Sequence, residues 1–441
     1  MSIDRRKALR IISQGVTGLA LPSLAGWPGD ARSADDKKPA AKPAPRQTPA
    51  RNKSPVPADA PAEDTEEEDK KKSTLVDDTE QFGRGRTQMA LLLPDIEGPY
   101  RFAADAVLRG VMAAHAVDGK GITVKVVRLL DENFADVAQV YRQLKRDRIQ
   151  QVIGPLIRAE VNGLSRLTEL PIPTLGLNLP DREHAIPGNC MLFSLAVEYD
   201  GRSAAQFAFA DLYQRIGDLR PIRALAISDN SELARRSSDA FLDSWQALGG
   251  EVEKPITRDI QTEEQMRRLL SGVRADMVFI AVEPDVLKII RPAFSAQLPL
   301  YGTSQLNLGA TPAVSNAQLL ATPELDGVRV VEMPWQLEPE NPIVALYPRS
   351  RRLPHLEMQR LYAFGIDAWR LARDMHAGKQ QITLDGVTGS LYVDLSVDPR
   401  VSREPLLGEY RQGILMPAYA SSFTQPATTT PPGRNPTRPN R

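Results

Sequence analysis

Hydrophobic and polar residues follow their clearest pattern in the segment 89–115. A short apolar run, Met89–Leu93, is followed by a turn-forming cluster, Asp95–Pro99. Apolar residues then recur at helical spacing over Arg101–Ala116. This order predicts a buried strand, a tight turn and an amphipathic helix. In an open α/β sheet such a turn lies at the carboxyl edge of the strands, where ligands bind.

The same alternation continues along the chain and predicts a parallel sheet with both faces covered by helices. The expected strands are Met89–Leu93, Ile122–Leu130, Gln151–Ile153 and Pro173–Leu177. The expected helices between them are Arg101–Ala116, Ala135–Arg146 and Arg158–Leu167.

After Met191–Leu195 and the helix Gly201–Ile216 the pattern restarts and predicts a second α/β sheet of similar plan. Its expected strands are Ile222–Ser228, Glu251–Ile256, Asp276–Val282 and Leu298–Thr303. Its expected helices are Glu232–Leu248, Glu263–Ser271 and Asp285–Ala296.

The last part of the globular region differs from this alternation. We expect a strand at Gly327–Met333, a long helix at Leu356–Met375, and closing strands at Ser390–Leu395 and Leu406–Met416. A chain that builds one lobe, then a second, and then returns crosses between them more than once. We therefore predict an α/β fold of two lobes with a cleft between them. Lobe 1 comprises about residues 87–198 plus 335–420, and lobe 2 about residues 199–334.

Both ends of the chain have a different composition. Residues 1–34 resemble an export signal, because Arg5, Arg6, Lys7 and Arg10 precede the apolar stretch Ile11–Leu24. The paired arginines favour the twin-arginine route, with the Sec route as the alternative. Residues 35–86 and 421–441 are low in complexity, and we expect a disordered linker and a disordered tail, with a charged docking segment as the alternative for residues 35–86.

Composition excludes several classes of function. The 55 basic residues equal the 55 acidic ones, so no overall positive field indicates a nucleic-acid partner. The lone Cys190 permits no disulfide and no cysteine metal cluster, and it is most simply a small buried side chain. It also lies far from the signal, so the expected signal has no lipobox cysteine.

Catalytic motifs are absent from the sequence. The four histidines are scattered, without HExxH spacing, and neither a G-x-S-x-G elbow nor a P-loop occurs. We therefore expect no catalytic residues, no metal and no cofactor.

Residues that follow the predicted strands are the candidates for contact with a ligand. The carboxyl ends of parallel strands share one edge, so these positions should face one cleft. They are Gly98, Pro99, Tyr100, Gly154, Asn178, Ser228, Asp229, Glu283, Thr303 and Ser304. Each of them alone is more often a cap or a turn residue, and only their convergence argues for a site.

Two further features are candidates for contact with a protein partner. Trp335, which ends a predicted strand, is interpreted as a wall of the cleft, as an anchor for a partner or as a packing residue at the hinge. Arg349, Arg351 and Arg352 form a basic loop that is either solvated or a docking patch for an acidic partner.

Several stretches form an ordered series along the globular region. The most specific is Leu361–Leu371, and the others are Ala90–Pro94 with Gly98–Tyr100, Pro173–Asn178, Tyr301–Ser304, Leu325–Arg329, Met333–Trp335, Gly386–Leu391 and Arg403. This series resembles the carboxy-terminal domain of the LppC family of penicillin-binding protein activators. The resemblance covers about residues 87–417. It implies a type I periplasmic-binding-protein fold, a periplasmic location, and stimulation of a bifunctional peptidoglycan synthase rather than catalysis.

Two functions therefore remain open at this point. The first is a non-enzymatic regulator of cell-wall synthesis that binds a membrane-bound synthase. The second is a periplasmic solute-binding protein of an ABC transporter, which closes over an amino acid or a similar small ligand. In that case Glu283 or Asp229 would bind the ammonium group, and Ser304, Thr303 and the Gly98 turn would bind the carboxylate.

Overall fold

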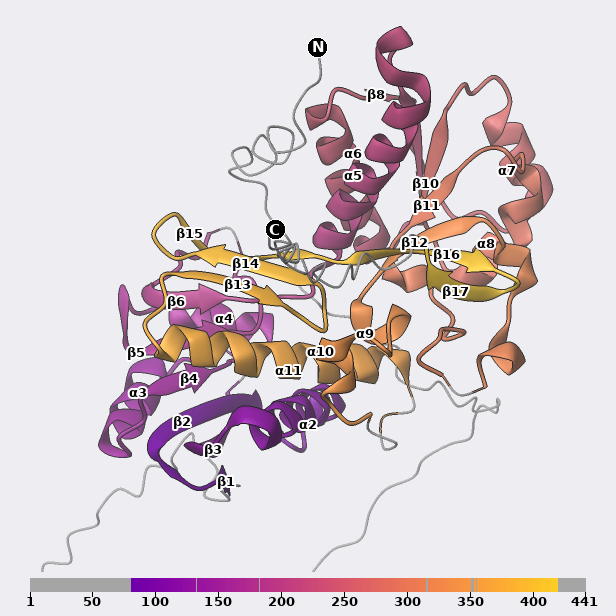
Figure 1. Ribbon diagram of the computed structural model, residues 1–441. Coiled ribbons are helices and arrows are strands. Elements are labelled where there is room, and N and C mark those ends of the chain that lie inside the picture. The colour runs from indigo at the N-terminus through magenta and orange to yellow at the C-terminus, as the bar shows by residue number, and fades with distance from the viewer. Residues whose placement is uncertain are drawn as a thin grey trace, which may run out of the picture. The chain divides into compact units, whose positions relative to one another are not determined.

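The computed structural model describes residues 81–418 except 132, 182, 315, 350–352 and 354. The predicted export signal, the predicted tail and residues 35–80 of the predicted linker lie outside the described residues, as do Arg351 and Arg352. Figure 1 shows two sheets with helices around them, which confirms the predicted α/β class. No helix within the described residues is both long and apolar enough to span a membrane.

The first sheet has nine strands in the order β1-β3-β2-β4-β5-β6-β15-β14-β13. Strands β2 to β6 run parallel, whereas β1, β13 and β14 add antiparallel edges. The bounds are β1 (Gln81–Gly83), β2 (Gly85–Pro94), β3 (Gly121–Leu129), β4 (Gln151–Ile153), β5 (Glu169–Gly176), β6 (Gly188–Leu192), β13 (Gln381–Asp385), β14 (Ser390–Asp394) and β15 (Asp398–Glu404).

Helices cover both faces of the first sheet, and the side chains of its strand β2 alternate between the two apolar cores. Met89, Leu91 and Leu93 of β2 belong to one apolar core with α2 (Arg101–Asp118) and α11 (Leu356–His376). Ala90 and Leu92 face the other core, with α3 (Val137–Arg146) and α4 (Arg158–Leu164).

The second sheet has eight strands in the order β17-β16-β12-β11-β10-β7-β8, with β9 beside β7. Helices α5 (Val197–Ile216) and α6 (Glu232–Ala247) pack on one face, and α7 (Glu263–Leu270) and α8 (Pro284–Ile290) on the other. The strands are β7 (Arg223–Ser228), β8 (Glu251–Val252), β9 (Ile256–Thr257), β10 (Met277–Ala281), β11 (Leu300–Gly302), β12 (Val328–Glu332), β16 (Leu406–Arg411) and β17 (Ile414–Pro417). The remaining helices are short: η1 (Gly217–Leu219), η2 (Arg291–Ala293), η3 (Ser304–Leu306), η4 (Ala317–Leu320), η5 (Pro323–Leu325), α9 (Pro334–Leu337) and α10 (Pro342–Ala345).

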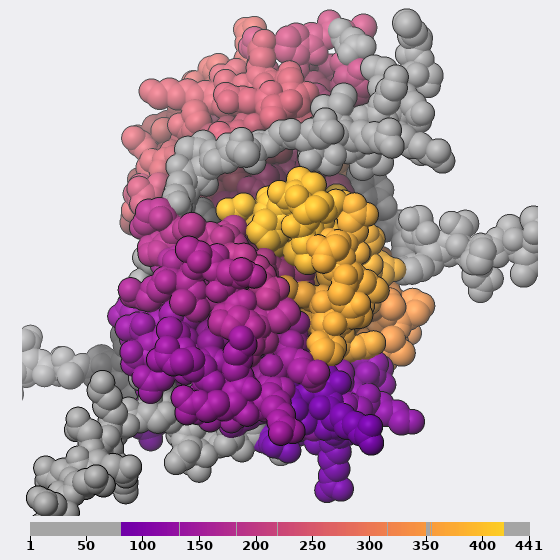
Figure 2. All heavy atoms as spheres, turned by 90° about the vertical axis from the view of Figure 1, so that its left-hand side faces the viewer, coloured from indigo at the N-terminus to yellow at the C-terminus, as the bar shows by residue number. Residues whose placement is uncertain are grey.

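The chain crosses between the two sheets three times: from β6 to α5, from β12 through α9 and α10 to α11, and from β15 to β16. The return is visible in Figure 2, where the yellow C-terminal segment lies against the magenta part of the first sheet. The contact is the parallel pairing of β15 with β6, in which Arg400 lies opposite Leu192.

The structure departs from the sequence-based expectations in a few places. The first sheet begins at Gln81, so residues 81–86 are β1 and the start of β2 rather than linker. The expected strand Leu406–Met416 is a hairpin that turns at Gln412 and Gly413, both with positive φ. This hairpin pairs with β12 in the second sheet. The sequence pattern instead predicts that residues 335–420 as a whole belong to lobe 1. The exact lobe boundaries stay a prediction.

The antiparallel strands β13 and β15 were not predicted, and Glu251–Ile256 divides into the short strands β8 and β9. The prediction that Cys190 is a small buried side chain is confirmed, since it is 5% exposed. Burial raises the pKa of its thiol to about 12.

Two glycines allow helices α2 and α11 to approach closely. A Cβ atom added at Gly110 would lie 2.0 Å from the carbonyl oxygen of Tyr362, and one added at Gly365 would lie 2.3 Å from that of Val107. Both obstacles are backbone atoms, which cannot move without separating the helices.

We predict that Gly365→Ala destabilises the protein by about 1–3 kcal/mol, because the methyl group overpacks the helix contact. In a helix without such a neighbour the same change stabilises the helix by about 1 kcal/mol. A loss of stability would therefore show that the added methyl group meets the backbone of the neighbouring helix. Urea unfolding of the full chain measures it. Gly98→Ala is the control, since its nearest new contact would be at 3.4 Å. Equal stability of the two variants would contradict the close approach.

Candidate functional site

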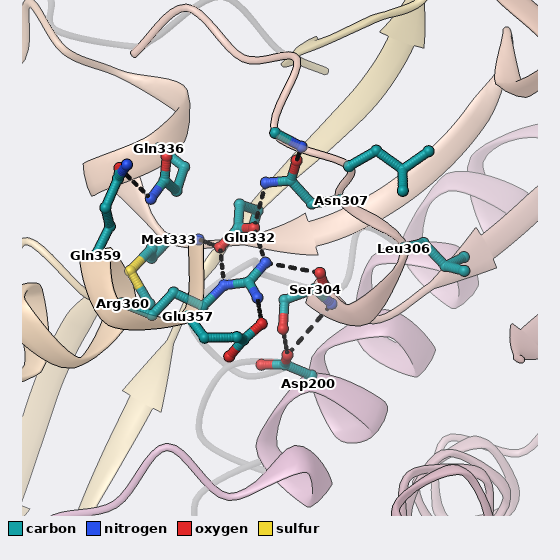
Figure 3. A network of polar contacts seen from close by, with 12 residues as sticks. Asp200, Ser304, Leu306, Asn307, Glu332, Met333, Gln336, Glu357, Gln359 and Arg360 are labelled. Atoms are coloured by element: carbon teal, nitrogen blue, oxygen red, sulfur yellow. Dashed lines mark hydrogen bonds and ion pairs between the residues drawn. The ribbon is translucent and has the colours of Figure 1, made fainter. Parts of the chain in front are cut away.

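Buried charged residues gather where the chain crosses between the sheets. We call Asp200, Ser304, Glu332, Arg360 and Arg403 the crossing network, and Figure 3 shows all of these residues except Arg403. Asp200 follows the first crossing, Glu332 precedes the second, and Arg403 precedes the third. The network therefore joins the three crossings to one another.

Arg360 of α11 is held by Glu332 at the end of β12. Its Nη2 atom donates to Oε2 of Glu332 at 2.6 Å and to the carbonyl oxygen of Ser304 at 2.7 Å. Glu357 accepts a further bond from Nη1. Burial alone lowers the pKa of Arg360, but the carboxylates of Glu332 and Glu357 outweigh it and raise the pKa. Arg360 therefore stays charged inside the protein.

Asp200 of α5 binds partners from both sheets. Its Oδ1 atom accepts from Nη2 of Arg403 at 2.5 Å, and its Oδ2 atom accepts from the hydroxyl of Ser304 at 2.7 Å. The side chains of Arg403 and Asp200 are only 4% and 7% exposed. Because α5 packs on the second sheet and β15 is in the first, this ion pair ties the two sheets together.

The contacts continue into the first sheet through a loop. Arg403 donates to the carbonyl oxygen of Thr388 at 3.3 Å. Thr388 in turn donates its hydroxyl to Asp367 of α11 at 2.7 Å, and the backbone N–H of Val387 donates to the same carboxylate at 3.1 Å. Helix α11 is thus held by Arg360 near its start and by Asp367 near its middle.

A second charged cluster lies beside the first crossing. Arg236 of α6 donates to Glu198 of α5 at 2.6 Å, and both side chains are buried. Arg158, which begins α4 at the carboxyl edge of the first sheet, lies 3.5 Å from Asp181. Burial lowers the pKa of Arg158, and the positive charge of Arg236 lowers it further. Helix α4 packs on the first sheet and α6 on the second, so the two arginines belong to elements of different sheets.

Three side chains next to this cluster have the donor types of a metal site. Ligand atoms of Asp181, Glu183 and His184 lie within 4.8 Å of one another. Asp181, however, already accepts from Asn162 at 2.6 Å and from Arg158. Since its oxygens are occupied by donors, this group gives no argument for a bound ion.

Of the ten predicted cleft residues, only Ser304 enters the crossing network, where its hydroxyl is occupied by Asp200. Asn178 bonds to Leu156 and Leu179, and Ser228 bonds to Thr257. These contacts stabilise the strand ends, and they occupy side-chain groups that the prediction assigned to contact with a ligand.

The other candidates lie as follows. Gly154 is buried and a Cβ atom there would meet the carbonyl oxygen of Leu92 at 2.2 Å, so it serves close packing. Thr303 is buried, whereas Glu283 is exposed and Asp229 half-buried. Gly98, Pro99 and Tyr100 form the turn before α2, where the N–H of Gly98 donates to Asp95. Two hollows in the described region, one at Arg86 and Arg148 and one at Leu129 and Phe134, are lined by other residues. Ligand contact by these residues stays a prediction.

Trp335 is a packing residue in this structure. It is 1% exposed, and its ring lies 5.4 Å from that of Tyr362. The guanidinium of Arg349 lies 4.3 Å from the Trp335 ring and bonds to its carbonyl oxygen. Trp335 is therefore no exposed anchor, and Arg349 is engaged within the chain rather than extended from a basic loop.

Sequence reasoning missed most of the crossing network, although one signal was present. Arg360 and Asp367 are seven residues apart, so they share a face with the apolar residues of the predicted helix 356–375. Charged residues at buried helix positions need partners. Their partners, Glu332 and Thr388, lie in other elements and could not be paired with them from spacing.

We predict that Asp200→Asn and Arg403→Gln each destabilise the protein by about 3–5 kcal/mol, because each leaves a buried charge without its partner. The double variant should lose less than the sum of the two. A double-mutant cycle by urea unfolding measures this coupling. The control pair is Glu264 and Arg268, whose side chains are 75% and 72% exposed, and we expect about 0–1 kcal/mol there. Additive losses at Asp200 and Arg403 would show that the pair does not hold the sheets.

Residues 80–413 match the family described as "LppC putative lipoprotein". A protein of Pectobacterium parmentieri named "Penicillin-binding protein activator LpoA" is 27% identical over 366 residues, which cover 72% of this chain and 52% of that protein. The protein of the same name from Pantoea ananatis is 25% identical over 338 residues, covering 66% and 47%. The chain thus spans about half the length of these relatives.

Two solved structures share the fold. "LpoA (YraM) C-domain from Haemophilus influenzae, a regulator of PBP1A" is 21% identical with a TM-score of 0.58, and covers 76% of this chain and 100% of that one. A structure from Chromobacterium violaceum described as "a putative branched-chain amino acid ABC transporter" is 31% identical with a TM-score of 0.61, and covers 74% and 100%. The family match spans most of the described residues, and this chain therefore belongs to the LppC family.

Proposed function

We propose that this protein is a non-enzymatic regulator in the cell envelope, which binds a bifunctional penicillin-binding protein and stimulates its synthesis of peptidoglycan. The observation that carries the proposal is the family match over residues 80–413, with relatives that are named as activators of a penicillin-binding protein. The export-like segment at residues 1–34 supports a periplasmic location.

The crossing network supports a regulator more than a closing receptor. A protein that closes over a solute must bend at the crossings between its lobes. Here Arg360–Glu332 and Arg403–Asp200 join those crossings through buried ion pairs. Bending would separate these charges, and a buried charge without a partner costs several kcal/mol. A fixed pair of lobes instead presents one constant surface.

A constant surface is what a binding regulator needs. If it fits only the active conformer of the synthase, binding shifts the synthase population toward that conformer. The size of the effect equals the difference in affinity for the two conformers, so a hundredfold preference corresponds to about 2.7 kcal/mol. No catalytic group on this chain is required.

We predict that the purified full chain retains a bifunctional penicillin-binding protein from the membranes of its source organism and raises its rate of glycan polymerisation. A pull-down followed by a polymerisation assay measures both. Heat-denatured protein is the control for nonspecific retention. If neither retention nor a change in rate is seen, the proposal is wrong.

A solute-binding function is the second candidate, and one observation favours it: the 31% identity to the structure described as a branched-chain amino acid transporter protein. We expect this candidate to fail a thermal-shift screen with amino acids, because Ser304 and Asn178 are already engaged within the chain. A ligand at about 100 times its Kd would stabilise the protein by about 2.7 kcal/mol. A shift of that size with any amino acid would favour solute binding instead.

A further inference from the structure

Exposed basic residues precede four neighbouring strands of the first sheet. In sheet order, Lys120 precedes β3, Arg84 and Arg86 flank the start of β2, Arg148 precedes β4, and Arg166 precedes β5. We call these five residues the amino edge. Neighbouring strands are about 4.8 Å apart, so the four strand starts extend over about 15 Å. All five side chains are exposed, and among the described residues none of them has an ion-pair partner.

The acidic residues beside the amino edge are mostly neutralised already. Asp147 accepts from Lys125 at 2.6 Å and from Gln143 at 2.9 Å. Asp118 pairs with Arg373. Glu169 is left as an exposed acid at the start of β5. The last turn of α3 adds Lys145 and Arg146 to the same end of the sheet, so positive charge dominates there.

The corresponding edge of the second sheet is built differently. Arg220, which precedes β7, forms two bonds with Asp276, which precedes β10, at 2.5 and 2.8 Å. This hydrogen bonding lowers the pKa of Asp276. Arg223 pairs with Glu251 of β8 at 2.8 Å. At this edge of the second sheet Arg220 and Arg223 are therefore paired with acidic residues, whereas the five cations of the amino edge have no acidic partner in the described part of the chain.

Arg86 and Arg148 also line one hollow, together with Gln88, Asp147, Ile149 and Gln150. Arg148 occupies the position after the C-terminus of α3 with φ of +59°. The N–H groups of Arg148 and Ile149 donate back to Lys145 and Leu144, which is the usual helix-ending motif. Glycine is the favoured residue at this position, and a side chain there is strained.

We propose that the amino edge is a docking face for an anionic phospholipid surface. Guanidinium groups bind phosphate oxygens through paired hydrogen bonds. The cations are spread along an edge rather than gathered in one pocket, which fits a surface of many phosphates. No aromatic side chain is exposed among the described residues of this edge, whereas protein interfaces usually contain such anchors. The edge lies at the opposite ends of the strands from the carboxyl edge, so both can be occupied together.

Binding of the purified full chain to vesicles tests this inference. We expect it to sediment with vesicles of phosphatidylglycerol and phosphatidylcholine, less so as salt is raised, and not with vesicles of phosphatidylcholine alone. Each cation near such a surface contributes about fivefold to the partition coefficient. Arg86→Gln with Arg148→Gln should therefore weaken binding by about 25-fold. Lys254→Gln with Arg274→Gln removes the same charge from exposed loops beside the second sheet, and we expect little effect.

A second variant separates loss of charge from loss of folding. Arg148→Gly should raise the melting temperature, because glycine adopts positive φ without strain, and should still weaken vesicle binding about fivefold. A loss of binding in a more stable protein cannot be caused by unfolding. The inference is overturned if the full chain does not bind vesicles that contain phosphatidylglycerol, or if the two double variants bind such vesicles equally well. It is also overturned if inorganic phosphate or isolated peptidoglycan binds at Arg86 and Arg148 while vesicles do not. The activation assay is a separate readout, so the two proposals fail independently.

Discussion

Arg403 and Asp200 meet inside the protein, where three segments of chain join the two sheets. Each of these charges would be costly to bury alone, and each is tolerated because the other lies within hydrogen-bonding distance. The same holds for Arg360 and Glu332. Arg360 also bonds to the carbonyl oxygen of Ser304, whose hydroxyl bonds to Asp200, so the two pairs form one connected group. The arrangement of the two sheets depends on this group, since apolar packing occurs mainly within each lobe.

Such a group has a functional consequence. Ion pairs that stay buried in one arrangement of the lobes resist any other arrangement, because water must enter before the charges separate. The fold is shared with proteins that bind small ligands, yet a shared fold does not fix a function. In this chain the buried pairs join the segments that cross between the lobes, and the proposed function uses them to keep one constant surface for a protein partner.

Much of the fold could be predicted from the sequence because its signals are local. The run Met89–Leu93, the turn after it and the helix at residue 101 lie close to where the pattern predicts them. The strands β13 and β15 were missed for different reasons. β13 alternates between polar and apolar residues, but over only five positions, Gln381–Asp385. β15 has a single buried apolar residue, Val401, and it pairs with β6, which lies far earlier in the chain. The hairpin β16–β17 was predicted as one strand because its turn at Gln412 and Gly413 gives only a short signal.

The site was less predictable for a related reason. Strand ends such as Asn178 and Ser228 were chosen by position, but what occupies their hydrogen-bonding groups depends on neighbours far along the chain. Asp200 and Arg403 are 203 residues apart in sequence. No periodicity links two such residues, and only the crossing of the chain between sheets brings them together.

The central claim is that buried ion pairs at the crossings hold the two lobes at one angle. Spin labels on Lys120→Cys and Lys254→Cys, one exposed position in each lobe, would report the distance between the lobes by pulsed electron resonance. The account predicts one narrow distance distribution, unchanged by a mixture of amino acids and broadened by Asp200→Asn. A broad distribution in the otherwise native chain, or a shift to a new distance when amino acids are added, would contradict it.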